Sequence, residues 1–271
     1  MDHILESYHY IDSQNYVDMI RRDVQLAGDP AKVFLDSGAF SAFTKGIEVN
    51  LPEFCEYIKR NGDIIKVASV LDGIGDPLKT WQNQREMERR GTKPLPCFHY
   101  GEDERYLEHY VANYPYITLG GMVPINKENL VYWLDRIWSK YLTDKDGLPK
   151  LKVHGFGLTR VGLMRRYPWY SIDSSSWVQS ARTGGIMIPE LGTFFVSRES
   201  PQRKEEGRHL DTLPMLHQRA IHEAVERRGF NLQRLQGTHL ARWTFNMRTY
   251  GELSDPLAPP KPFRISQQTL F

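Results

Sequence analysis

The sequence predicts an α/β fold: a (β/α)8 TIM-type barrel followed by a C-terminal helical extension. Short runs rich in Val, Ile, Phe and Tyr alternate with stretches of helical periodicity, which is typical of βαβ units around a parallel sheet. The length of 271 residues suits a barrel, because such folds commonly fill ~200–250 residues as one domain. No G-x-G-x-x-G motif follows any expected strand, which favours a closed barrel over an open dinucleotide-binding sheet.

Eight strands are expected, each a short apolar run. They are Ile4–His9, Lys32–Asp36, Ile64–Asp72, Pro94–His99, Tyr116–Gly121, Leu151–Phe156, Trp169–Asp173 and Gly185–Ile188. Between them, Asn50 followed three residues later by Glu53 predicts a helix that begins with a capping box. Residues 130–141 carry apolar side chains three and four apart, which predicts a second helix. Residues 76–90 predict a polar, exposed helix ended by Gly91.

The pattern changes towards the C-terminus, so we expect residues 1–197 to form the catalytic barrel and residues 198–271 to pack on it. This second part contains a charged loop, a helix centred on Ile221, a second helix over residues 232–251 and a Pro-rich tail from Ser254 to Phe263. No zinc subdomain is expected, because no cysteine lies beyond Cys97. Apolar packing should hold the helices instead, through Leu213, Leu216, Ile221, Leu235 and Leu240.

Composition excludes several classes of protein. The 35 Lys and Arg residues nearly balance the 33 Asp and Glu residues, for a net charge of +2, so charge alone does not indicate nucleic acid. No apolar run reaches the ~20 residues that span a bilayer, and the N-terminus lacks a signal peptide, so a cytoplasmic location without membrane contact is expected. Two cysteines, Cys55 and Cys97, provide neither a disulfide framework nor a four-cysteine zinc site. We expect no metal and no cofactor.

Three expected strands end in or next to an aspartate: Asp36, Asp72 and Asp173. In barrels, catalytic residues lie at the C-terminal ends of strands, so these carboxylates should surround one mouth. Each also has a structural interpretation. Asp36 and Asp72 could accept hydrogen bonds in the turns that follow them, and Asp173 could cap the next helix.

Other polar residues at the strand ends are ambiguous. His99 and His154 could each belong to a site, although a lone histidine at a strand end is more often hydrogen-bonded within the structure. The Cys97–His99 pair lacks further metal ligands at a useful spacing. Gly120 and Gly121 predict either a tight turn or close approach of backbone to a flat ligand. Four arginines form either a solvated face or phosphate contacts near the mouth. They are Arg160, Arg165, Arg166 and Arg182.

One run of residues resembles a known family. Leu35-Asp36-Ser37-Gly38-Ala39-Phe40 is similar to the DSGGF/Y motif of the tRNA-guanine transglycosylase superfamily. Further pieces resemble that family's motifs in the same order along the chain. They are Asp72, Phe98-His99-Tyr100-Gly101, Leu119-Gly120-Gly121-Met122, Ile172-Asp173, Ala181-Arg182-Thr183-Gly184 and Gly237-Thr238-His239 with Phe245-Asn246 and Tyr250.

The departures from the family pattern indicate a particular branch. His99 stands where the family has Gln, Ala39 where it has Gly, and the C-terminal zinc ligands are missing. These differences resemble the divergent members of phages and bacterial genomic islands, which exchange guanine in DNA for a 7-deazaguanine. The resemblance therefore implies DNA as the polymer, ahead of tRNA, and a bacterial or phage-infected host cell. It also implies a base such as preQ0 as the second substrate, and a homodimer or a protein partner.

The resemblance implies a role for each residue. Asp173 is the nucleophile that captures C1′ after the glycosidic bond breaks, and Asp36 transfers the proton to and from the base. Asp72 accepts hydrogen bonds from the base. The remaining substrate-binding residues are Ser37, Phe40, His99, Gly120, Gly121 and Arg182. The target base must leave the helical stack before it can react.

Two other functions remain open from the sequence. A nucleoside hydrolase or DNA glycosylase on the same scaffold would resolve the intermediate with water rather than with an incoming base. A non-catalytic nucleic-acid-binding subunit of an active partner is the second alternative, although such a subunit has no need of both Asp36 and Asp173.

Overall fold

The computed structural model describes residues 4–11, 14–27, 33–253 and 261–265. The chain divides into two compact units. The first runs to Asp173 and takes up the chain again at Pro260, and the second comprises Ser174–Pro259. Each unit is described below by itself.

The first unit is an α/β structure with parallel strands. Strands β1 (Ile4–Ser7), β2 (Val33–Asp36) and β3 (Ile65–Ala68) form one parallel sheet in chain order. Strands β4 (Cys97–His99), β5 (Tyr116–Gly120), β6 (Lys152–Gly155) and β7 (Ser171–Ile172) form a second. A parallel bridge between Ser69 and Leu95 continues this order from one sheet towards the other. The predicted parallel α/β organisation is therefore confirmed.

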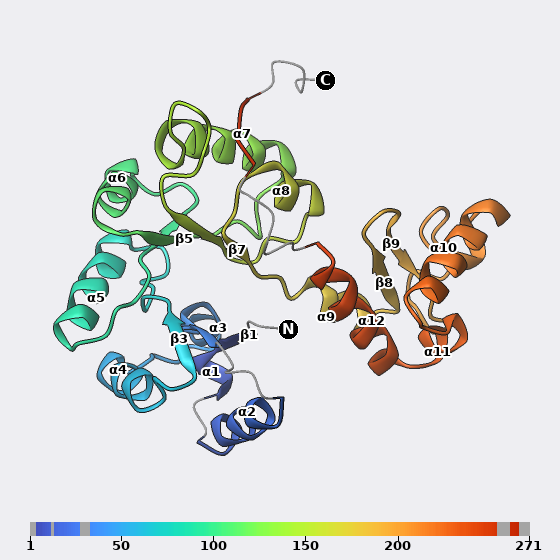
Figure 1. Cartoon of the computed structure of the whole chain (residues 1–271), viewed down its shortest axis with the longest axis horizontal. Coiled ribbons are helices and arrows are strands. Elements are labelled where there is room, and N and C mark those ends of the chain that lie inside the picture. The colour runs from blue at the N-terminus through green and yellow to red at the C-terminus, as the bar shows by residue number, and fades with distance from the viewer. Residues whose placement is uncertain (1–3, 12–13, 28–32, 254–260, 266–271) are drawn as a thin grey trace. The chain divides into compact units, whose positions relative to one another are not determined.

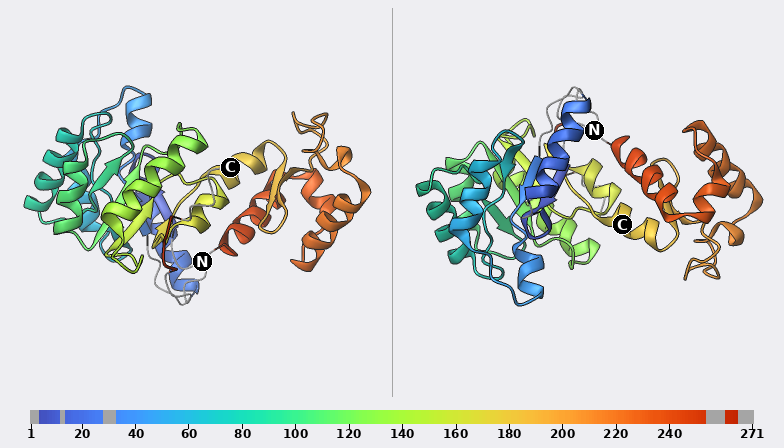
Figure 2. Two further views of the ribbon diagram at one scale, coloured as in Figure 1. Left: turned by 90° about the horizontal axis from the view of Figure 1, so that it is seen from above. Right: turned by 90° about the horizontal axis from the view of Figure 1, so that it is seen from below.

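Helices lie outside the strands of this unit (Figures 1 and 2). They are α1 (Tyr8–Ile11), α2 (Gln14–Ala27), α3 (Ala39–Thr44), α4 (Leu51–Arg60), α5 (Pro77–Arg89), α6 (Glu104–Asn113), α7 (Lys127–Ile137) with the π-helical turn η1 (Trp138–Leu142), and α8 (Val161–Arg166). The cap expected at Asn50 is present, since its side chain accepts from the Glu53 N–H at 3.2 Å. The helix expected to be exposed, α5, buries one polar face, on which Asn83 donates to the Leu71 carbonyl at 2.7 Å.

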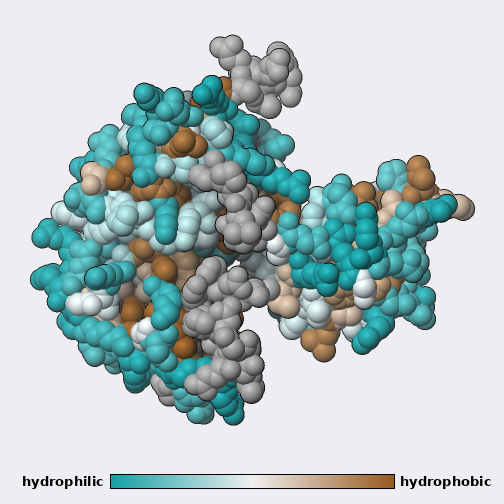
Figure 3. Space-filling model, in the orientation of Figure 1, coloured by the Kyte–Doolittle hydropathy of each residue, from teal (hydrophilic) through white to brown (hydrophobic). Residues whose placement is uncertain are grey.

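Two apolar clusters form the core of the first unit. One surrounds Phe54 and Leu35, and the other surrounds Trp138 and Ile117. In the face shown in Figure 3, hydrophobic residues gather towards the middle of this unit and hydrophilic ones towards its rim. The expected Pro-rich tail lies mostly outside the described residues, but Phe263 is buried in the second cluster, and its N–H donates to the Gly147 carbonyl at 2.8 Å.

The strand expected to be the eighth of the barrel lies in the second unit and does not pair as expected. Residues Gly185–Ile188 do form a strand, β8, but it pairs antiparallel with β9 (Gly192–Phe195) in a sheet of its own. Gly192 adopts a φ of 110° at the tight turn, a conformation that favours glycine. A short apolar run is compatible with a parallel or an antiparallel partner, and the tight turn between β8 and β9 makes this pair antiparallel. Accordingly, the compact units divide after Asp173 rather than at the boundary expected at residue 197.

Helices complete the second unit: α9 (Ser176–Arg182), the 3-10 turn η2 (Leu210–Thr212), α10 (Met215–Arg227), α11 (Leu232–Gly237) and α12 (His239–Gly251). The single helix expected over residues 232–251 is divided at Thr238, whose hydroxyl accepts from the Ala241 N–H at 3.1 Å. In the described ranges, no helix has the length and apolarity needed to cross a membrane.

The apolar packing expected for these helices is partly wrong. Leu213, Ile221 and Leu235 are buried in one cluster, whereas Leu216 is 77% and Leu240 60% exposed. Leu216 precedes Ile221 by five positions, which places it about 140° away around the helix. It therefore faces away from the buried stripe.

Candidate active site at the strand ends

Asp36 lies within electrostatic reach of Asp72 and Asp173 in the first unit. Asp36 is the last residue of β2, Asp72 lies in the loop after β3, and Asp173 directly follows β7. Burial raises the pKa of Asp36 to about 6, with further contributions from the negative charges of Asp72 and Asp173. The sequence thus identified carboxylates that the fold brings into one electrostatic neighbourhood.

The turn after Asp36 holds its carboxylate in place. The Gly38 N–H donates to Asp36 Oδ2 at 3.0 Å, so the structural interpretation of Asp36 as a turn acceptor also holds. Gly38 has a φ of 72°, and a Cβ there would lie 2.6 Å from the Cβ of His9. Ser37 is fully buried, and its N–H donates to Ser69 Oγ at 3.0 Å. Its hydroxyl therefore lies within the turn, whereas Phe40 on α3 is 68% exposed.

Asp173 is fixed through one oxygen. Its Oδ1 accepts from the Gly157 N–H at 2.9 Å and lies 3.3 Å from His154 Nε2. It does not cap α9, because Ser175 occupies that N-cap position. Oδ1 is therefore anchored by the loop after β6 and by a side chain of β6 itself.

His154, which the sequence left ambiguous, contacts Asp173 from a buried position. It is 2% exposed, and its Nδ1 lies 2.8 Å from Ser171 Oγ, which lies 2.7 Å from the Tyr116 hydroxyl. An ionised carboxylate only accepts hydrogen bonds, so Nε2 donates to Asp173 and Nδ1 accepts from Ser171 in the neutral imidazole. His154 pairs with Ser171 across β6 and β7. This pairing could have identified His154 from the sequence only if the register of the two strands had been known.

Asp72 lies beside His99 at the end of β4. His99 Nε2 is 3.5 Å from Asp72 Oδ2, and His99 Nδ1 is 3.0 Å from Glu102 Oε1. Burial lowers the pKa of His99, but the negative charges expected at Cys97 and Asp72 outweigh it and raise the pKa overall. Burial also raises the pKa of the Cys97 thiol to about 11. Asp72 Oδ1 is buried and has no hydrogen-bond partner among the described residues.

Gly120, the last residue of β5, and Gly121, which follows it, allow close approach to this group. Gly120 pairs with His99 across β4 and β5, and a Cβ on Gly120 would lie 2.8 Å from His99 Cδ2. Gly121 has a φ of 70°, which a side chain would strain. The positive φ of Gly121 fits the turn interpretation, and the approach of backbone to a flat ligand stays a prediction.

The four arginines have different surroundings. Arg166 makes two hydrogen bonds to Asp135, at 2.6 and 2.9 Å, so it is part of the internal structure. Arg160 and Arg165 are exposed in the first unit. Arg182 is also exposed, but it lies on α9 in the second unit. Of these side chains, the structure leaves Arg160 and Arg165 as exposed charges of the unit that carries the carboxylates.

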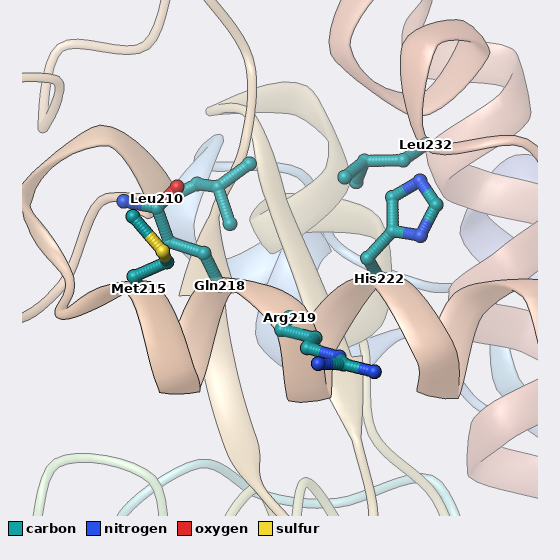
Figure 4. A pocket seen from close by; sticks show the side chains of 6 residues that line it. All are labelled: Leu210, Met215, Gln218, Arg219, His222 and Leu232. Carbon is teal, nitrogen blue, oxygen red and sulfur yellow. The ribbon is translucent and has the colours of Figure 1, made fainter.

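A hollow of about 280 Å³ lies elsewhere, in the second unit. Its lining side chains come from α10 and from the ends of η2 and α11 (Figure 4): Leu210, Met215, Gln218, Arg219, His222 and Leu232. No carboxylate is among them, and Met215 is 84% exposed. This hollow has no arrangement suited to the chemistry expected from the sequence.

Comparison with known proteins adds no assignment, since no family model and no curated protein matches this chain.

Proposed function

We propose that the chain is a transglycosylase that exchanges guanine in DNA for a 7-deazaguanine base. The observation that carries this proposal is the set of three carboxylates, in which Asp36 has its pKa raised to about 6 beside Asp72 and Asp173. Glycosidic-bond chemistry through a covalent intermediate needs one ionised carboxylate and one that exchanges protons near neutral pH. This set provides candidates for both.

Asp173 is the proposed nucleophile. Its Oδ1 is held by Gly157 and His154, which leaves Oδ2 to attack C1′ of the target nucleotide. The C1′–N9 bond breaks as the C1′–O bond forms, and the bonding electron pair leaves with the base. Asp36 donates a proton to that departing guanine. It then takes the proton from the incoming base, whose nitrogen attacks C1′ and releases Asp173.

Asp72, His99 and the two glycines are the proposed base-binding residues. Asp72 Oδ1 is a buried acceptor with no protein donor among the described residues, and the N1–H and exocyclic amine of guanine would satisfy it. The backbone at Gly120 and Gly121 approaches this group closely and would donate to the base carbonyl. Phe40 would stack on the base, a contact worth ~1–3 kcal/mol.

A (β/α)8-type barrel is the proposed finer architecture of the first unit. Strands β1 to β7 are parallel and follow one another in chain order, and a barrel would bring the ends of β2, β3 and β7 around one mouth. The eighth position is not supplied by β8, which pairs with β9.

The test is incorporation of labelled guanine, and separately labelled preQ0, into guanine-containing DNA, with tRNA as a parallel substrate. Asp76→Asn serves as the matched control, because Asp76 follows the same strand as Asp72 but caps α5, a role that Asn also fills. We expect incorporation into DNA by the wild type and by Asp76→Asn. Guanine release without incorporation would instead indicate a hydrolase. Binding without either reaction would indicate a non-catalytic subunit.

A further inference from the structure

The cluster of Asp72, Cys97 and His99 has the composition of a metal site. Each residue offers one ligand atom, and the three atoms lie within 4.8 Å of one another. Cys97 and His99 are two positions apart on β4, so their side chains lie on the same face of the strand. Asp72 joins them from the loop after β3, 25 residues earlier in the chain. The sequence spacing alone had suggested no third ligand.

Two of the three ligand separations match the edges of a zinc tetrahedron, and the third, between Cys97 and Asp72, is within 4.8 Å. Cys97 Sγ lies 3.5 Å from His99 Nε2, which lies 3.5 Å from Asp72 Oδ2. Zinc bonds of about 2.3 Å to sulfur and about 2.0–2.1 Å to nitrogen and oxygen, at tetrahedral angles, separate the ligands by roughly 3.3–3.6 Å. The His99–Asp72 separation is long for a hydrogen bond, for which ~2.7–3.2 Å is usual.

The surroundings of His99 favour a ligand role. Glu102 Oε1 lies 3.0 Å from Nδ1, and Glu102 Oε2 accepts from the backbone N–H of His99 at 2.9 Å. A carboxylate on one ring nitrogen fixes the ring and directs the other nitrogen to a metal. Gly120 provides the space, because a Cβ there would lie 3.1 Å from both Cys97 Sγ and His99 Nε2.

We propose that Asp72, Cys97 and His99 bind one divalent transition-metal ion, best satisfied by Zn²⁺, with a fourth position open to an exogenous ligand. A thiolate, a carboxylate and a neutral imidazole balance the two positive charges of the ion. Three protein ligands with one open position are typical of catalytic rather than structural zinc. This site replaces our expectation of a metal-free protein, which was based on sequence spacing.

The metal site shares Asp72 and His99 with the proposed base-binding group, so His99 would contact the ion in place of the base, but the two proposals are tested separately. Coordination through Asp72 Oδ2 leaves Oδ1, the buried atom without a partner, to accept from the base. Metal binding is measured without nucleic acid. Metal binding without base exchange would support the metal site and contradict the proposed exchange. Base exchange without metal binding would support the exchange and contradict the metal site.

The experiment loads the chelator-treated full chain with Zn²⁺ or Co²⁺ alone. After dialysis, we expect about one zinc per chain by elemental analysis, and a thiolate-to-cobalt charge-transfer band in the Co²⁺ form. Cys97→Ser should lose that band and weaken zinc binding more than about 100-fold. Glu102→Gln, which removes only the supporting carboxylate, should weaken it about 10–100-fold.

Cys55→Ser is the matched control, because Cys55 is also a buried cysteine but lies on α4. It should bind zinc like the wild type. Circular dichroism and the melting temperature identify variants that fail to fold, and Asp72→Asn provides a second, shape-conserving test. Wild-type protein without stoichiometric metal and without the cobalt band would overturn the proposal. A band that survives in Cys97→Ser would overturn it as well.

Discussion

The ends of β4 and β6 place a histidine in opposite surroundings. His154, on β6, is packed against Phe34 and Phe156, with ring centroids 4.5 and 4.7 Å away, and it has a hydroxyl on one nitrogen and Asp173 on the other. His99, on β4, lies between two carboxylates and beside a buried thiol. The first environment fixes one orientation of a single carboxylate. The second gathers negative charge around a ring nitrogen, which is the environment that a cation needs.

The nucleophile should show the largest effect. Asp173→Asn conserves shape and can still accept from Gly157, but it removes the negative charge that captures C1′. We expect exchange to be abolished and DNA affinity to stay nearly unchanged, as measured by labelled-base incorporation and by a binding titration. A covalent adduct with this variant on a denaturing gel would assign the nucleophile to Asp36 or Asp72 instead.

Asp36→Asn should retain a slow reaction, because general acid–base catalysis typically contributes ~10²–10⁴-fold. The inflection near pH 6 in the rate profile should disappear, since the pKa of Asp36 is about 6. A covalent adduct should accumulate, because the intermediate still forms but is resolved slowly. An unchanged pH profile would remove Asp36 from proton transfer.

The same substitution should stabilise the fold at neutral pH. The folded state favours the protonated form of Asp36, since its pKa rises from 3.8 to about 6. The contribution of Asp36 to the free energy of unfolding is therefore fully present below about pH 4 and is lost as the pH rises through about 6. A pKa unit corresponds to ~1.36 kcal/mol, so the free energy of unfolding falls by at most about 3 kcal/mol. Partial exposure of Asp36 to solvent makes this an upper limit. Urea unfolding should show Asp36→Asn more stable than wild type at pH 7, with the difference vanishing near pH 4.

A smaller effect is expected at the end of β6. His154→Phe removes the contact to Asp173 Oδ1 and should lower kcat about 10–100-fold, because misplacement of a reacting group by ~1 Å can cost ~100-fold. KM should change little. His154→Gln retains a donor and should recover most of the activity. If both variants lose stability and activity in parallel, His154 has only a packing role.

The smallest effect concerns the exposed arginines. DNA affinity should fall with salt, and Arg160→Ala and Arg165→Ala should each reduce the slope of log K against log salt by about one. Arg89→Ala is the control, since it lies in the last turn of α5, away from the strand ends. Binding that is insensitive to salt would contradict a phosphate-contacting surface.

Local patterns in the sequence predicted the parallel strands and the three aspartates, because strand periodicity and the residue after each strand are read within a few positions. The pairing of Gly185–Ile188 was not predictable in this way, since an apolar run of four residues does not specify its partner. The same holds for Asp72 beside Cys97 and His99, and for His154 beside Ser171. These contacts depend on strand register and on loop geometry, which cannot be inferred from the spacing of residues in the sequence.

The burial of Phe263 makes the second unit an insertion. The first unit is built from two separate stretches of chain, with Ser174–Pro259 between them, and its apolar cluster includes Phe263, whose ring lies 5.1 Å from that of Tyr167. A chain ending after α12 would thus lack part of the core of the other unit, and loss of a buried Phe side chain typically costs ~3–5 kcal/mol. During synthesis, the unit with the three carboxylates would be complete only after the inserted unit had left the ribosome. Folding of the proposed catalytic unit is thereby tied to a segment that follows the inserted unit in the chain.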